Sequence, residues 1–310
     1  MLQLHTQANN YHQLTPPSST TNAPKVKSWK TSLAMGIVTS MMALISLPAQ
    51  ALQVRLTPES PQLGDTISVY METETSGSQP TVSMGGKNYP AFPIRDNLYR
   101  TLLPTTPLDQ PGRVSVRVSG DGEVQNLAVW LRNRSFPTQR IWLSGRGSGK
   151  ATQLELDRVA DFKKLVTPEK FWNGAFLRPN RARVSTIFGV RRYYNGVFAQ
   201  NYYHRGVDYA GGMGSPVIAP ASGRIALTGK ESEGFYVHGN TIGMDHGQGV
   251  LSVFLHLSKI YVQEGDFVQA GQTIGTIGST GASTGPHLHW GLYVNGAAVD
   301  PVPWRFGGID

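Results

Sequence analysis

The chain has 310 residues, a length typical of about two domains. Charged residues make up only 15% of it, and its 35 glycines and 20 prolines favour turn-rich β structure over long helices. The absence of cysteine excludes disulfides, thiolate metal sites and a lipidated N-terminal cysteine. The formal net charge is +8, but no basic helix, zinc finger or aromatic RNA-binding motif accompanies it, so we expect no nucleic-acid partner.

Residues 1–51 predict export. A polar leader is followed by three lysines, an apolar run over residues 33–47 and the small-residue pattern Ala49-x-Ala51. This order is that of a secretory signal peptide, and the apolar run is shorter than the roughly 20 residues of a membrane span. We therefore expect a protein exported to the periplasm, the cell wall or the extracellular space. The alternative is that the signal segment is not cleaved and anchors the protein in a membrane.

Residues 52–135 predict an N-terminal Ig-like β-sandwich. Short alternating runs separated by Gly and Pro turn signals indicate strands. They lie at residues 54–56, 66–70, 81–84, 98–102, 114–118 and 127–131. This region contains no histidine, so it cannot contribute one to a metal site. A spacer, binding or inhibitory role fits it.

Residues 136–176 are predicted to be a connector with a short helix. Leu154, Phe162 and Leu165 recur there at roughly helical intervals with charges between them. Residues 177–310 are β-rich again and form the second predicted domain, so the expected fold class is all-β.

Three histidines of the second domain lie on predicted strands. The two-residue period places His256 on the same side as Phe254 and Ser252. The same period projects His287 and His289 from one face of a later strand.

The spacing of histidines and one aspartate predicts a metal site. His204 and Asp208 form an H-x-x-x-D pattern, and His287 and His289 form H-x-H. Neutral imidazole and carboxylate suit Zn²⁺, and a catalytic zinc site uses three protein ligands and leaves a fourth position to water. Together with His256, these residues offer more ligands than the three that one zinc ion takes from the protein, so the remaining histidines could transfer protons.

A carrier function is a weaker alternative. Residues 262–275 resemble the hairpin-and-strand units of lipoyl and biotinyl carrier domains, which present a modified lysine at a hairpin tip. The nearest lysine, Lys259, lies outside any such tip. Shared β geometry explains the similarity.

Over most of residues 180–303 the sequence resembles the M23 family of zinc metallopeptidases, the lysostaphin/LytM type, which cut peptide bonds in peptidoglycan. The motifs that carry the resemblance are STIFGVRR, HRGVDYA, SPVIAPASGRI, GNTIGMDHGQGV, FLHLS and STGASTGPHLHWGLYVNG, with Asp300-Pro301 after them. Their occurrence together in this order is highly specific. The resemblance implies a LytM-type antiparallel β-sheet peptidase domain with a groove, preceded by a β-sandwich as in some family members.

The resemblance also implies roles for five residues. His204, Asp208 and His289 match the zinc ligands, and His256 and His287 match the catalytic histidines. The implied function is that of a secreted zinc endopeptidase, expected to be a monomer, that acts on peptidoglycan stem peptides or cross-links. The alternative is a non-catalytic regulator that binds the wall and activates another hydrolase, although such members typically lack zinc ligands. The bond that is cut, and which histidine is the base, stay open.

The roles of several other polar residues are predicted less specifically. His238 and His246 lie in glycine-rich turn contexts and are expected to be structural or exposed. A tyrosine near the site in some family members corresponds to Tyr202 or Tyr203. The pair at positions 191–192, two arginines, could contact an anionic substrate or simply be solvated.

Overall fold

The computed structural model describes residues 52–74, 77–142, 150–307 and 309. The leader and signal peptide predicted over residues 1–51 lie outside this part. Within the described residues, no helix combines the length and the apolar character needed to cross a membrane.

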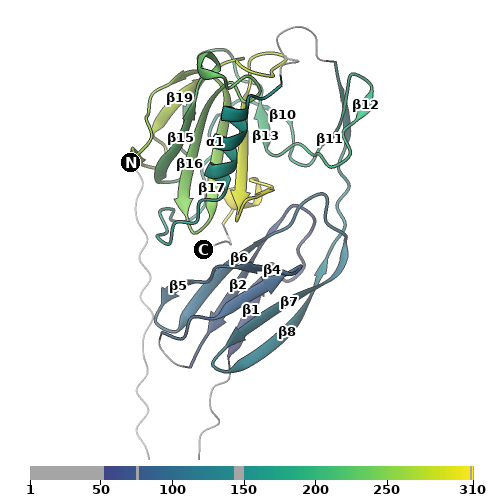
Figure 1. Ribbon diagram of the computed structural model, residues 1–310, viewed down its shortest axis with the longest axis vertical. Helices are drawn as coiled ribbons and strands as arrows, with labels where there is room; N and C mark the ends of the chain where they lie inside the picture. The colour runs from purple at the N-terminus through teal and green to yellow at the C-terminus, as the bar shows by residue number, and fades with distance from the viewer. Residues whose placement is uncertain (1–51, 75–76, 143–149, 308, 310) are drawn as a thin grey trace, which may run out of the picture. The chain divides into compact units, whose positions relative to one another are not determined.

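The first region forms two four-stranded antiparallel sheets with orders β1-β2-β6-β5 and β4-β3-β7-β8 (Figure 1). The strands are β1 Gln53–Thr57, β2 Thr66–Glu72, β3 Thr81–Met84, β4 Lys87–Tyr89, β5 Phe92–Arg95, β6 Leu98–Pro104, β7 Gly112–Gly120 and β8 Glu123–Leu131. Val69 of β2 and Val116 of β7 belong to one buried cluster, so side chains from both sheets share a core. The predicted sandwich strands are therefore present, while the Ig-like assignment and the predicted domain boundaries stay predictions.

The second region is organised by a ten-stranded sheet. Its main path runs β10-β13-β20-β17-β16-β15-β18, and β14, β19 and β21 join beside it through antiparallel pairs. The strands are β10 Val184–Thr186, β13 Val207–Tyr209, β14 Pro216–Ile218, β15 Gly223–Gly229, β16 Asn240–Gly247, β17 Val250–Ile260, β18 Phe267–Val268, β19 Thr273–Ile277, β20 Leu288–Val294 and β21 Ala297–Val299. Two 3-10 helices, η2 Glu231–Glu233 and η3 Pro303–Arg305, lie between strands or after the last one. This architecture confirms the predicted all-β class with an antiparallel second sheet.

A small sheet lies beside these two regions, in the order β12-β11-β9. Its strands are β9 Thr138–Ile141, β11 Arg191–Tyr194 and β12 Val197–Phe198. Strand β9 falls within the predicted connector and pairs in parallel with β11, about 50 residues later in the chain. The sequence did not indicate β9, because four mostly polar residues show no alternation and the partner strand is distant.

The connector helix is α1, Gln153–Lys163. The side chain of Thr152 caps it by accepting a hydrogen bond from the Glu155 N–H at 3.1 Å. Its buried residues are Glu155, Val159 and Phe162, whereas Leu154 is 51% exposed. The predicted helix is confirmed, but Leu154 was wrongly placed on its apolar face. The carboxylate of Glu155 occupies the buried face instead.

His246 on β16 is a structural histidine, as predicted. It is completely buried, with Nδ1 2.9 Å from the Ser222 carbonyl and Nε2 2.8 Å from the Ser252 hydroxyl. Burial lowers the pKa of His246 to about 4. The imidazole is therefore neutral in the folded protein at neutral pH.

This buried histidine predicts a loss of stability in acid. The pKa of His246 is lower in the folded than in the unfolded chain, so between pH 6.5 and 4 the unfolded state binds more protons. The free energy of unfolding therefore decreases as the pH is lowered through this range. The expected loss from this group is about 3 kcal/mol. Urea unfolding at several pH values should show a steeper loss in the wild type than in His246→Gln, whose amide can bond the same neighbours without titrating. Equal slopes for the two proteins would refute the prediction.

Candidate metal centre

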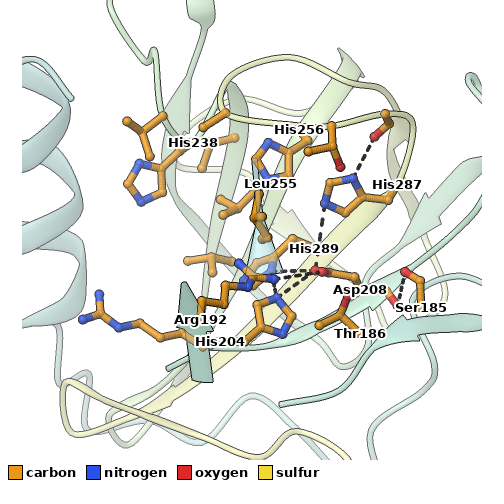
Figure 2. A pocket seen from close by; sticks show the side chains of 18 of the residues that line it. Ser185, Thr186, Arg192, His204, Asp208, His238, Leu255, His256, His287 and His289 are labelled. Carbon is orange, nitrogen blue, oxygen red and sulfur yellow. Dashed lines mark hydrogen bonds and ion pairs between the residues drawn. The ribbon is translucent and has the colours of Figure 1, made fainter. Parts of the chain in front are cut away.

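Strand pairing brings the three predicted ligands together. Asp208 on β13 lies directly opposite His289 on β20, and His204 precedes β13. Asp208 Oδ1 lies 3.0 Å from His204 Nε2 and 2.9 Å from His289 Nδ1, and the two nitrogens are 3.0 Å apart. All three side chains are buried. Figure 2 shows them converging on one point at the floor of a cavity.

The donor set fits zinc. His204 Nδ1 lies 2.8 Å from the Ile187 carbonyl and must donate to it, which leaves the lone pair of Nε2 directed at the cluster. Zn–ligand bonds of about 2.0–2.2 Å in a tetrahedron separate ligand atoms by roughly 3.4 Å, slightly more than the spacing here. Burial alone would raise the pKa of Asp208, but His204 and His289 lower it well below its usual value. Asp208 is thus a carboxylate, as a metal ligand must be.

A glycine permits the close approach of the ligand strands. A Cβ at Gly206 would lie 2.3 Å from the Trp290 carbonyl oxygen and 2.8 Å from His289 Nε2. No side chain fits there without moving backbone. Gly206, within HRGVD, therefore allows the chain between His204 and Asp208 to lie against β20.

The two predicted catalytic histidines line the same cavity. The ring centroids of His256 and His287 are 4.8 Å apart. Each Nδ1 lies 2.8 Å from a backbone carbonyl, that of Thr280 for His256 and that of Gly285 for His287. Each Nε2 is therefore the ring nitrogen left for chemistry, and His287 Nε2 lies 4.0 Å from Asp208 Oδ1.

The predicted orientation of His256 is wrong. It shares the cavity with Val253 and Leu255, whereas Ser252 bonds to His246 on the other face. The ladder between β16 and β17 shifts register beside His256, whose φ is +64°. This local irregularity breaks the two-residue alternation on which the prediction rested.

The cavity has a volume of about 580 Å³ and includes residues that the sequence patterns indicate weakly or not at all. Tyr202 lines it, whereas Tyr203 is buried and donates its hydroxyl to the Ala298 carbonyl at 2.9 Å. Burial and the neighbouring Tyr194 raise the pKa of Tyr202, so its phenol stays protonated. The structure thus favours Tyr202 as the tyrosine near the site.

Arg192 and His238 also line the cavity. The Arg192 guanidinium lies 3.7 Å from Asp208 Oδ2, away from the oxygen that faces the histidines. His238, expected to be structural or exposed, pairs with Glu155 at 2.6 Å. Arg192 ends the motif STIFGVRR, which assigns it no role, and His238 lies just before β16, where its partner Glu155 is about 80 residues away in the chain.

Comparisons with known proteins agree with this geometry. The model of peptidase family M23 matches residues 202–301. The DD-carboxypeptidase/endopeptidase Mpg of Neisseria meningitidis serogroup B is 40% identical over 120 residues, 39% of this chain and 26% of that protein. The peptidoglycan DD-endopeptidase ShyA of Vibrio cholerae is 38% identical over 189 residues, 61% of this chain and 39% of that protein. The chain thus spans less than half the length of either relative.

A solved structure extends the similarity beyond the matched domain. The crystal structure of a proposed peptidase M23 from Pseudomonas aeruginosa superposes with a TM-score of 0.60 at 24% identity, covering 80% of this chain and 96% of that chain. At this identity the likeness concerns the fold. Residues 202–301 of the chain are thus a domain of peptidase family M23.

Proposed function

We propose that the protein is an exported, zinc-dependent endopeptidase that hydrolyses peptide bonds in peptidoglycan stem peptides or cross-links. The observation that carries the proposal is the convergence of His204, Asp208 and His289 within 3.0 Å of one another, in a cavity that also holds His256 and His287. Two similar relatives are named as peptidases of the DD-endopeptidase type. The activity named for ShyA supports peptidoglycan as the substrate. Peptidoglycan lies outside the cytoplasm, which agrees with the predicted signal peptide.

Zinc held by the three ligands would supply a water of pKa about 7 and polarise the scissile carbonyl. The remaining residues of the cavity handle protons and charge. Burial, then His287 and His289, lower the pKa of His256 to about 3, so this imidazole is neutral near pH 7 and its Nε2 can accept a proton. The Nδ1–H of His287 faces the Gly285 carbonyl, so only as an imidazolium can its Nε2, beside Asp208, donate a hydrogen bond to a developing oxyanion or return a proton to the leaving amine. The Tyr202 phenol adds a third donor at the same cavity.

A non-catalytic regulator remains the alternative function. A regulator needs the groove but neither zinc ligands nor oriented histidines. The complete set of five residues in one cavity therefore favours the enzyme.

The ligand assignment predicts metal loss in three variants. Replacing His204, Asp208 or His289 by Ala removes one of three protein ligands, so bound zinc should fall from about one per chain to a small fraction. Release of soluble peptides from isolated peptidoglycan should fall with it. Elemental analysis of the purified proteins measures the zinc, and Asp161→Ala, an exposed carboxylate on α1, is the matched control. Full zinc occupancy in any of the three ligand variants would contradict the assignment.

The two remaining histidines should separate catalysis from metal binding. His256→Ala and His287→Ala should keep about one zinc, because neither residue belongs to the cluster of three ligand atoms. Their peptide release should fall by roughly 10²–10⁴-fold, the usual contribution of a positioned acid or base. Lys259→Ala, exposed on the same strand as His256, should retain activity. Wild-type rates in both histidine variants would contradict the catalytic roles of His256 and His287.

A further inference from the structure

Helix α1 buries a carboxylate against the rim of the cavity. The Glu155 side chain is completely buried on the inner face of α1. It accepts hydrogen bonds from the backbone N–H groups of residues 236, 237 and 238 at 3.1, 3.0 and 2.6 Å, and from His238 Nδ1 at 2.6 Å. Three successive amides and one imidazole thus converge on a single carboxylate.

The Glu155 carboxylate is ionised in this setting. Burial alone would raise its pKa, but the hydrogen bonds and charge of His238, with the Val237 amide, outweigh it and lower the pKa. A buried carboxylate with four donors is stable only while all of them stay in place. The start of α1 makes a further bond to the same loop, from the Thr152 hydroxyl to the Gly234 carbonyl at 3.0 Å. Glu155 therefore fixes the position of residues 236–238 relative to α1.

The segment 236–238 in turn holds the backbone at His256 and in the loop before His287. The His238 carbonyl accepts the backbone N–H of His256 at 3.1 Å, and the Val237 carbonyl accepts the N–H of Ala282 at 2.9 Å. Ala282 lies in the loop that leads to His287. Two successive carbonyls, next to the amides that Glu155 binds, thus support both predicted catalytic residues.

His256 needs such support because of its backbone. Its φ of +64° lies in the left-handed region, which costs a non-glycine residue about 1 kcal/mol or more and persists only when the surroundings enforce it. Its N–H and its Nδ1 are held by carbonyls of two different loops, those of His238 and Thr280. A shift of either loop would turn Nε2 away from the cavity. In Figure 2, His238 and His256 lie along the same rim.

We propose that Glu155 is a positioning residue for the reaction: its carboxylate clamps residues 236–238, and this segment holds His256 and the 280–287 loop in their working geometry. This inference rests on the proposed function for its catalytic consequence. It also means that α1, which precedes the matched domain at residues 202–301, completes the active site.

The test is Glu155→Gln in the full chain. A glutamine is nearly the same size, but its NH₂ group would face N–H donors where the carboxylate oxygens accept. We expect kcat for peptide release to fall roughly 10- to 100-fold, as for small misplacements of catalytic groups, with zinc still near one per chain and KM little changed. Asp157→Asn, an exposed carboxylate on the same helix that bonds only to Gln153 among the described residues, is the control and should behave as the wild type.

Amide hydrogen exchange distinguishes positioning from general stability. In Glu155→Gln the backbone amides of His256 and Ala282 should exchange faster, while those in the middle of β20 keep their protection. Unchanged kcat together with unchanged exchange at these two amides would overturn the proposal, as would a uniform loss of protection across the fold. If the wild type itself releases no peptide, the proposed function fails, and the exchange result still decides whether Glu155 holds His256.

A second variant covers the case in which Glu155→Gln does not fold. His238→Ala removes the imidazole donor but keeps the three backbone donors. It should give a smaller fall in kcat and a smaller rise in exchange at the His256 amide. Wild-type values for both would count against the clamp.

Discussion

The pairing of β13 with β20 is the constraint on which the site depends. It sets Asp208 opposite His289, and Gly206 lets the preceding turn bring His204 to the same point. A one-residue slip in this ladder would send either ligand to the opposite face. Tyr209, Leu288 and Trp290 flank the two ligands and are fully buried, so hydrophobic burial in the sheet fixes the register that the metal centre requires. The stability of the core and the geometry of the ligands are thus two results of the same strand pairing.

Two of the three proposed ligands, Asp208 and His289, lie on paired strands, whereas His256 lies at an irregularity of β17 and His287 directly precedes β20. His256 has a left-handed backbone, and His287 follows a loop that residues 236–238 support. The clamp proposed for the buried Glu155 of α1 explains how this less regular half of the site stays ordered. Strand β9 and its partner β11 likewise bring Gln139 and Arg192 to the cavity. Residues 136–176 therefore form part of the groove as well as a connection between two β regions.

The sequence predicted the class of fold and the grouping of the three candidate ligands because these depend on short motifs and alternation. H-x-x-x-D and H-x-H each fit one strand or turn, and the structure brings His204, Asp208 and His289 together. Leu154, Phe254 and Ser252 show where such reasoning fails. Glu155 occupies the buried face assigned to Leu154, because its partners are backbone amides about 80 residues away. The face of His256 was wrong because a period-two rule cannot foresee a left-handed residue. Tertiary hydrogen bonding decided both cases, and no local pattern encodes it.

The most direct test of the central claim is hydrolysis of a purified cross-linked peptide dimer in H₂¹⁸O by the zinc-loaded protein alone. The account predicts that the dimer separates into two peptides and that one ¹⁸O enters the newly formed carboxylate, as attack by water at the metal centre requires. Mass spectrometry of the products would also identify the bond that is cut. Two results together would contradict the account and identify the protein as a regulator. The protein alone would leave the dimer intact, and a second hydrolase would cleave the dimer faster in its presence than in its absence.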